Sequence, residues 1–242
     1  MAELLLLSNS VSPGMGFLAH ARGVISEVVP PGSRLLFLPY AVANQDHYAG
    51  VMTDALAPLS IAVTSAHQVP DPVAALAGCD AVFCGGGNSF RLLAALQSAG
   101  LVTALRERVR AGLPYLGASA GTNMACPTLR TTNDMPIVQP QSFAAIGLIP
   151  FQINAHYFDP DPASTHQGET RPQRIAEFLE CNDVPVLGLR EGSWLRVSGS
   201  VAAIGGTAGA RLFRRGQETM ELSPGADVSD LVGVRPRFDV PV

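Results

Sequence analysis

Lysine is absent from this chain, and charged side chains of any kind are scarce. All sixteen basic residues are arginines, and charged residues make up 15% of the 242 positions. Schiff-base chemistry and the phosphate-binding lysine of a P-loop are therefore excluded. The net charge of -4 provides no overall field that would attract nucleic acid or an anionic membrane. We expect neither of these as a partner.

Cysteine and long apolar runs are also limited. The four cysteines, at positions 79, 84, 126 and 181, have no C-x-x-C spacing, and a chain of this length needs no disulfide to support its core. No apolar run approaches the roughly 18 residues that span a bilayer. The first residues lack the basic region of a signal peptide. These absences predict reduced thiols, no membrane partner and a cytoplasmic location.

Short apolar runs alternate with helical patterns in the first half of the chain, which is typical of βαβ units. Their unbroken apolar character predicts parallel strands covered by helices on both faces. The predicted strands are Leu4 to Leu7, Leu35 to Leu38, Ile61 to Val63, Ala81 to Cys84 and Leu113 to Leu116. Two helices are predicted between the last two of these strands, the first capped at Asn88 and ended by Gly100, the second ended by Gly112.

The second half of the chain predicts one more helix and a set of hairpins. Apolar residues at positions 175, 178 and 179 indicate the helix, which follows a proline-rich loop at 159–162. The strands expected after it are Val184 to Leu189, Trp194 to Val197, Val201 to Ile204 and Ala210 to Phe213. We therefore expect an α/β fold, a mostly parallel sheet with an antiparallel C-terminal extension, as a single domain over residues 1–242.

The sharpest local signal is the G-x-S-x-G pattern at 117–121, directly after a predicted strand and before a possible helix at Thr122 to Cys126. A serine on such a strand-to-helix turn stands clear of the sheet as a nucleophile. The Ala120 N–H then becomes available to an oxyanion. Small residues beside a serine can also mark close packing alone, so both interpretations stand.

A second glycine-rich turn, Gly85 to Gly87 followed by Asn88, comes after the preceding predicted strand. Its unshielded N–H groups are suited to an anion, with Gly87 as the candidate partner of Ala120 in an oxyanion hole. Neither nucleotide-binding glycine pattern is present. The alternative to an anion site is that this segment is an ordinary turn. Both loops should lie at the carboxyl ends of parallel strands, where such folds bind ligands.

A catalytic serine needs a base and a group that orients it. The histidines are at positions 20, 47, 67, 156 and 166, and His156 follows an apolar run that resembles the end of a strand. Asp134 and Glu191 each lie at the edge of an apolar run, and either could orient an imidazole. The chain order Ser119, His156, Glu191 leaves more residues between the catalytic groups than the order Ser119, Asp134, His156. Only the latter is the order of an α/β-hydrolase, so the former argues against that fold.

Arg171 lies at the start of the predicted helix that follows the proline-rich loop. A cation there opposes the helix dipole, so it either pairs locally with Glu169 or meets an external anion. A helix N-terminus with an arginine fork suits a carboxylate. The local ion pair and the substrate carboxylate site both remain open.

Together these segments resemble the S51 family of serine peptidases, the peptidase E or aspartyl dipeptidase family. The resemblance covers nearly the whole chain. Its strongest stretches are Gly85 to Phe90, Gly117 to Asn123, Thr131 to Pro136, Asn154 to Phe158 and Gly168 to Arg171. It implies a flavodoxin-like fold akin to class I glutamine amidotransferases. It also implies metal-free, cofactor-free cleavage of dipeptides that begin with aspartate.

On this resemblance Ser119 is the nucleophile, His156 the base and Glu191 the orienting acid. Asp134 is either a rival orienter or part of the substrate pocket, which would also include Arg171 and Asn88. The expected partner is a small peptide with N-terminal aspartate, and the expected state is a monomer or homodimer. Two alternatives remain: a cyanophycinase-like or isoaspartyl hydrolase of the same fold, and a non-catalytic protein that binds small anions.

Overall fold

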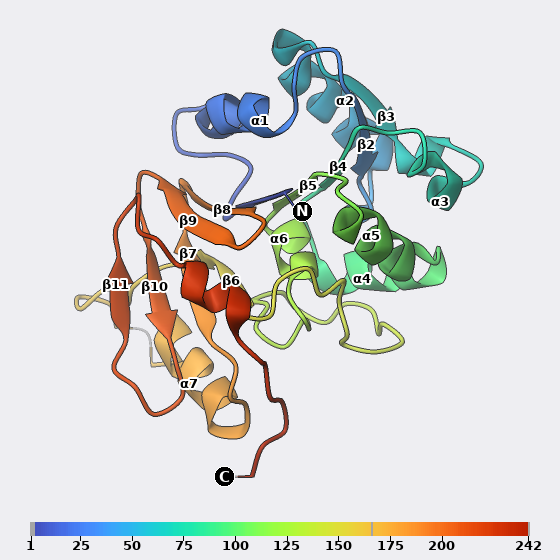
Figure 1. Ribbon diagram of the computed structural model, residues 1–242. Coiled ribbons are helices and arrows are strands. Elements are labelled where there is room, and N and C mark those ends of the chain that lie inside the picture. Colours follow the sequence, from blue (N-terminus) through green and yellow to red (C-terminus); the bar gives the residue numbers. More distant parts are fainter. Residues whose placement is uncertain (1–2, 166, 242) are drawn as a thin grey trace.

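The strands of the chain form two sheets, seen in a computed structural model that describes residues 3–165 and 167–241 (Figure 1). The larger sheet has the order β3-β2-β4-β5-β1-β8-β9, and the smaller has the order β11-β10-β7-β6. The strands are β1 (Glu3–Leu7), β2 (Arg34–Leu38), β3 (Ala62–Ser65), β4 (Ala81–Cys84), β5 (Tyr115–Ala118), β6 (Gln152–Tyr157), β7 (Val186–Arg190), β8 (Ser193–Ser198), β9 (Val201–Gly206), β10 (Ala210–Phe213) and β11 (Met220–Leu222).

Helices cover both faces of the larger sheet, as the apolar strands predicted. The α-helices are α1 (Arg22–Val28), α2 (Gln45–Leu56), α3 (Pro72–Ala75), α4 (Ser89–Ser98), α5 (Leu101–Arg110), α6 (Ala120–Ala125) and α7 (Arg171–Cys181). In β1, Leu4 and Leu6 belong to the buried cluster that includes α4, α5 and α6. Leu5 and Leu7 belong to the cluster formed with α1 and α2. Alternate side chains of one strand thus enter two cores.

The parallel part of the larger sheet confirms the flavodoxin-like expectation with one change of connection. Strands β2 to β5 have the flavodoxin order, in which the second strand lies outside the first. The place beside β5 is taken by β1, which is parallel to β5 and antiparallel to β8. The carboxyl ends of β4, β5 and β1 therefore lie side by side.

The C-terminal strands divide between the two sheets, which the expectation of one antiparallel extension did not anticipate. β8 and β9 continue the larger sheet, whereas β7 and β10 join β6 and β11 in the smaller one. The pairing of β6 with β7 is parallel. One buried cluster contains side chains from both sheets, including Leu6 and Leu189. This shared core supports a single domain, which stays a prediction.

Two of the boundaries that differ from the sequence pattern lie on either side of Ser119. β5 begins and ends two residues later than predicted, since Pro114 precedes its first ladder pair, and α6 begins at Ala120 rather than Thr122. Helices α1 and α2 were not predicted. The buried face of α2 consists of Ala49, Met52, Ala55 and Leu56, with Gly50 inside the helix, so its apolar signal is weak.

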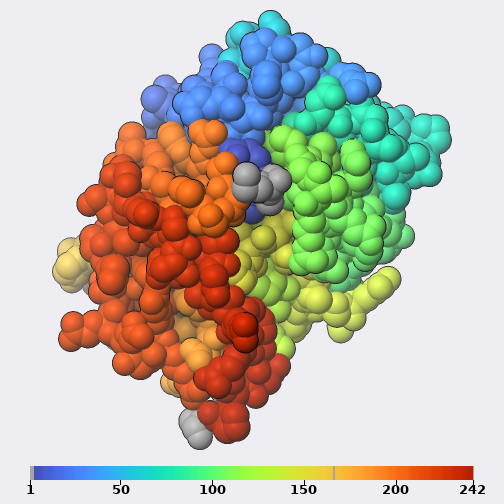
Figure 2. Space-filling view, in the orientation of Figure 1, coloured from blue at the N-terminus to red at the C-terminus, as the bar shows by residue number. Residues whose placement is uncertain are grey.

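Figure 2 shows the face on which the C-terminal strands, orange to red, pack against the N-terminal part, blue to green. Among the described residues, none of the helices combines the length and apolar character that crossing a bilayer requires.

Two helical glycines provide a matched test of packing. A Cβ on Gly121 would lie 1.9 Å from the Cys84 carbonyl oxygen, whereas a Cβ on Gly50 would meet nothing within 4 Å. We expect Gly50→Ala to raise the free energy of unfolding by about 0.5–1 kcal/mol. Gly121→Ala should lower it by about 3 kcal/mol, because overpacking forces α6 from β4. Urea unfolding of both variants measures this, and equal effects would contradict the contact.

Candidate active site

The G-x-S-x-G segment forms a tight turn that places Ser119 between β5 and α6. Ser119 has φ 52° and ψ -109°, a region that non-glycine residues rarely adopt, at a cost of about 1–3 kcal/mol. Its N–H donates to the Leu7 carbonyl at 3.1 Å, and its carbonyl accepts from the Asn123 N–H at 3.0 Å. Bonds to both neighbouring segments therefore hold the strained residue in place.

The two glycines of the pattern are required by packing. A Cβ on Gly117 would lie 2.6 Å from the Gly121 backbone, and a Cβ on Gly121 would overlap the end of β4. The close-packing interpretation of this segment is thus confirmed, and the role of the half-buried Ser119 as a nucleophile stays a prediction. Close approach of the helix to the strand is what makes the turn at Ser119 sharp.

His156 lies on β6, as predicted, at a local irregularity of the strand. The register of the β6–β7 ladder shifts between Ala155 and Tyr157, and His156 has φ 53°. Such a bulge re-aims a side chain out of the regular alternation. The His156 N–H, which is displaced from the ladder, donates to the Ser8 hydroxyl at 2.9 Å.

Ser119, His156 and Glu191 are bonded in series. His156 Nε2 is 2.8 Å from Ser119 Oγ, and His156 Nδ1 is 2.6 Å from Glu191 Oε1. Glu191 occupies the turn between β7 and β8. The histidine and glutamate side chains are 41% and 53% exposed, so solvent and small molecules can reach them. This is the geometry in which a carboxylate orients an imidazole toward a hydroxyl.

Asp134 does not take the orienting position that the sequence left open to it. Its Oδ2 accepts hydrogen bonds from the Ser89 N–H at 2.7 Å and the Thr132 hydroxyl at 3.3 Å. The carboxylate thus lies at the N-terminal end of α4, where the helix dipole favours negative charge. Its other oxygen has no hydrogen-bond partner among the residues that the structure describes.

The glycine turn after β4 lies against the serine. A Cβ on Gly86 would be 3.3 Å from Ser119 Cβ, and the Gly86 N–H donates to the Tyr48 hydroxyl at 2.9 Å. Gly87 has φ 132°, and a Cβ there would lie 2.6 Å from the Ala41 carbonyl oxygen. Within the described chain, the N–H groups of Gly87 and Ala120 make no hydrogen bond, so both can donate to a ligand.

Arg171 begins α7 without a carboxylate partner within ion-pair distance among the described residues, so the predicted local pair with Glu169 is absent. Burial lowers the pKa of its guanidinium, and repulsion from Arg174 adds to this, while attraction to Asp134 opposes it. The guanidinium lies 5.2 Å from the centre of the Phe158 ring. Arg171 and Phe158 line a cavity of about 360 Å³. An arginine remains charged under these conditions. The lining also includes Arg174 and the carboxylates of Asp159, Asp161 and Glu169, so the candidate partner for an anion is the Arg171 guanidinium itself and not the net charge of the cavity.

Asn88 caps α4, as its position in the sequence predicted. Its Oδ1 accepts from the Arg91 N–H at 3.0 Å, and its Nδ2 donates to the Met135 carbonyl at 2.8 Å. The side chain therefore joins the segment that contains Asp134 to the start of α4. Its assignment to the substrate site stays a prediction.

Residues 7–9, at the end of β1, were not singled out from the sequence, yet they contact all three segments of the series. The Leu7 carbonyl accepts from Ser119, and the Ser8 hydroxyl accepts from His156 and donates to the Leu189 carbonyl at 2.7 Å. Asn9 Oδ1 accepts from the Gly192 N–H at 2.8 Å, next to Glu191. The available signal in the sequence was that Ser8 and Asn9 are polar and come directly after an apolar run. Both are buried in the structure.

Among the remaining histidines that the structure describes, none is hydrogen-bonded to Ser119, His156 or Glu191, and His47 is exposed on α2. His67 bonds Asp46 Oδ1 at 2.8 Å, His20 has buried ring nitrogens, and His166 lies outside the described residues. Within the described ranges, no three histidine, cysteine or acidic side chains are grouped as metal ligands would be.

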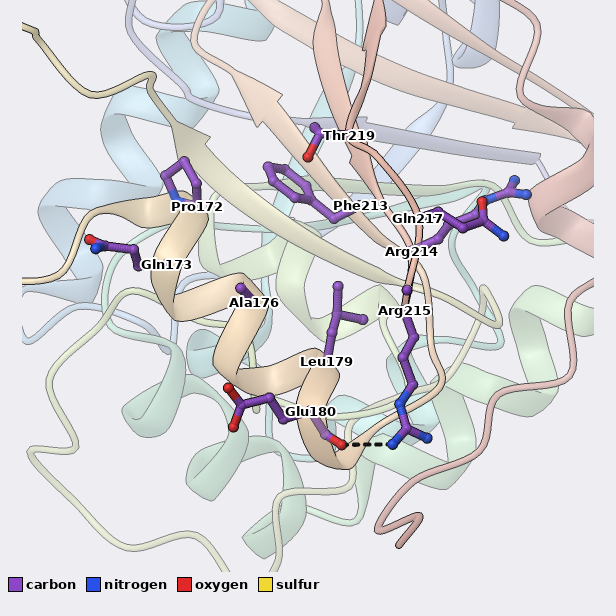
Figure 3. A pocket seen from close by; sticks show the side chains of 11 residues that line it. Pro172, Gln173, Ala176, Leu179, Glu180, Phe213, Arg214, Arg215, Gln217 and Thr219 are labelled. Atoms are coloured by element: carbon purple, nitrogen blue, oxygen red, sulfur yellow. Dashed lines mark hydrogen bonds between the residues drawn. The ribbon is translucent and has the colours of Figure 1, made fainter. Parts of the chain in front are cut away.

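A separate cavity of about 640 Å³ lies between α7 and the β10–β11 hairpin. Figure 3 shows its apolar floor, including Leu179 and Phe213, and the bond from the Arg215 guanidinium to the Glu180 carbonyl. None of the three residues bonded in series lines this cavity.

A serine on a strand-to-helix turn, bonded in series to a histidine and a glutamate in an α/β fold, defines the chain as a serine hydrolase. The sequence profile of Peptidase family S51 matches residues 4–205. The chain belongs to this peptidase family, as the resemblance implied.

Relatives support the family over nearly the full length. The chain is 61% identical over 237 residues to a "Peptidase E" of Streptomyces coelicolor, with 98% of each chain covered. It is 46% identical to a "Probable alpha-aspartyl dipeptidase" of Drosophila melanogaster, covering 95% of this chain and 97% of the other. A crystal structure of a peptidase from an acI-B1 Actinobacterium has the same fold, with a TM-score of 0.65 at 16% identity over 94% and 96% of the two chains.

The Ser8 hydroxyl provides a direct test of how the histidine is positioned. Ser8→Ala leaves the His156 N–H without its acceptor, so we expect Ser119 to react about tenfold more slowly with a fluorophosphonate probe. The free energy of unfolding should fall by about 1–3 kcal/mol. Ser33→Ala, a surface change that removes a bond to the Pro30 carbonyl, is the control. Unchanged labelling in a folded Ser8→Ala protein would contradict the positioning role.

Proposed function

We propose that this chain is a serine exopeptidase that hydrolyses dipeptides, and also short peptides, that begin with aspartate. The observation that carries the proposal is the Ser119–His156–Glu191 series, and it is supported by Arg171, which has no carboxylate within ion-pair distance among the described residues. The names of the relatives, peptidase E and alpha-aspartyl dipeptidase, support the same substrate. The partner is thus a small peptide with N-terminal aspartate.

The chemistry follows from the hydrogen bonds. His156 Nε2 takes the Ser119 proton, and Oγ attacks the carbonyl carbon of the aspartate residue, while the Gly87 and Ala120 N–H groups stabilise the oxyanion. The protonated His156, held by Glu191, then gives its proton to the leaving amine as the C–N bond breaks. An aspartyl ester on Ser119 remains. Water, deprotonated by His156, hydrolyses this ester and restores the serine.

Two charged groups distinguish an N-terminal aspartate from other residues. Arg171 pairs with the side-chain carboxylate of the substrate. The free Oδ1 of Asp134, whose charge acts on Arg171, accepts from the substrate's α-ammonium group. A substrate that leaves either group unpaired loses several kcal/mol of binding. This assigns Asp134 to the substrate pocket, the second of the two roles that the sequence allowed.

The cellular setting is part of the same proposal. All four cysteines are free thiols, which fits a reducing compartment such as the cytoplasm. The reaction as written needs no metal or cofactor, and a monomer or homodimer would suffice for it.

The decisive measurement compares p-nitroanilides of Asp, Glu, Asn and Leu in the presence of EDTA. We expect cleavage of the Asp compound alone, and its loss in Ser119→Ala with the fold retained. Arg171→Gln should lower kcat/KM for the Asp compound by about a thousandfold, because the carboxylate loses its charged partner. Binding without turnover would favour an anion-binding protein, and cleavage only of isoaspartyl or cyanophycin-like substrates would favour the related hydrolases.

Asp134 and Glu191 differ in the kinetic constant that they control. Glu191→Gln should lower kcat about a thousandfold with little change in KM, because the imidazole loses its orienting carboxylate. Asp134→Asn should raise KM at least tenfold, because the α-ammonium loses its acceptor. Thermal melts confirm that each variant folds. A large fall in kcat for Asp134→Asn at unchanged KM would contradict the assignment of Asp134 to the substrate.

A further inference from the structure

A third cavity is lined by Glu191, the acid of the hydrogen-bonded series. It has a volume of about 520 Å³ and lies between the loop that follows β1 and the turns that end β7 and β9. Its lining includes Pro13, Met15, His20, Glu191, Trp194 and Thr207. Glu191 is thus shared between this cavity and the hydrogen-bonded series, on the side of the His156 imidazole away from Ser119, and neither Ser119 nor His156 lines the cavity.

The lining of this cavity has fewer charged groups than that of the Arg171 cavity, which also contains Arg174, Asp159, Asp161 and Glu169. No arginine lines it, and burial lowers the pKa of the His20 imidazole despite an opposing contact with the Asn9 backbone, which favours its neutral form. Glu191 is its one acidic lining residue. The site therefore offers no partner to an anion, and its thioether and indole suit an uncharged side chain.

The two side walls of the cavity have different rigidity. Trp194 lies opposite Gly205 across the β8–β9 ladder, and a Cβ on Gly205 would be 2.2 Å from the indole Nε1, so the glycine forms a seat for the ring. Met15 is 52% exposed on the facing loop. Its unbranched side chain can adapt to ligands of different shape.

The position of the leaving amine in the proposed reaction indicates which part of the substrate fills this cavity. A dipeptide has one side chain on each side of the scissile bond, and the Arg171 cavity takes the first. The two cavities share no lining residue. His156 connects them. It precedes Phe158, which lines the Arg171 cavity, by two residues, and it bonds Glu191, which lines the other cavity. The leaving amine must lie near His156 to receive its proton.

We propose that the cavity beside Glu191 is the subsite for the residue after aspartate, and that Met15 and Trp194 make it selective for apolar and aromatic side chains. This inference rests on the proposed function. It predicts that the second residue of the substrate is selected by packing, in contrast to the charge pairing that selects the first.

The test measures kcat/KM for Asp-Phe, Asp-Leu, Asp-Ala and Asp-Gly. We expect the wild type to favour Asp-Phe and Asp-Leu over Asp-Gly at least tenfold. Met15→Ala should reduce this preference about fivefold, with the largest losses for Asp-Phe and Asp-Leu, because glycine has no side chain to contact the thioether. Met220→Ala, which changes a methionine that is 57% exposed on β11, is the matched control and should behave as wild type.

Two outcomes would overturn the inference without touching the proposed function: equal kcat/KM for all four dipeptides, or an equal loss for all four in Met15→Ala. Failure of the folded wild type to cleave any of the four would instead remove the proposed function, and the subsite with it.

Discussion

The hydrogen bonds made by residues 7–9 at the end of β1 are the constraint on which the rest of the site depends. The Leu7 carbonyl holds the Ser119 turn, the Ser8 hydroxyl holds the displaced N–H of His156, and the Asn9 amide holds the residue after Glu191. The three side chains come from two sheets. One short segment at the junction of those sheets therefore sets their distances, and this explains why its polar atoms are buried and paired.

Backbone strain is concentrated where the chemistry is proposed. Ser119 and His156 both have positive φ, a conformation that costs free energy and that only surrounding contacts can maintain. For Ser119, the bond to Leu7 of β1 and the close packing of the neighbouring glycines impose this conformation. For His156, the bond to Ser8 and the bulge in β6 impose it. The same devices turn both side chains away from their regular directions and toward each other, so strain and the hydrogen bond between them have one origin.

The sequence predicted the local features of the site more fully than its long-range contacts. Ser119, the two glycine turns, the end of β6 and the start of α7 follow from apolar runs and capping residues close to them in the chain. The choice between Asp134 and Glu191 did not, because it depends on which strand ends meet in space. The pairing of β8 with β1 and the contacts of residues 7–9 likewise join segments more than a hundred positions apart, which periodicity does not encode.

The position of β1 in the larger sheet has a consequence for biosynthesis. This strand is made before its partners β5 and β8, which follow it by more than a hundred and nearly two hundred residues. Closing such long loops has an entropic cost that only the completed pairing offsets. The ribosome must therefore release the chain through β8 before nucleophile, base and acid can meet. A partly synthesised or C-terminally truncated chain would carry every motif of the first half and still have no assembled catalytic series, which keeps an immature hydrolase inactive.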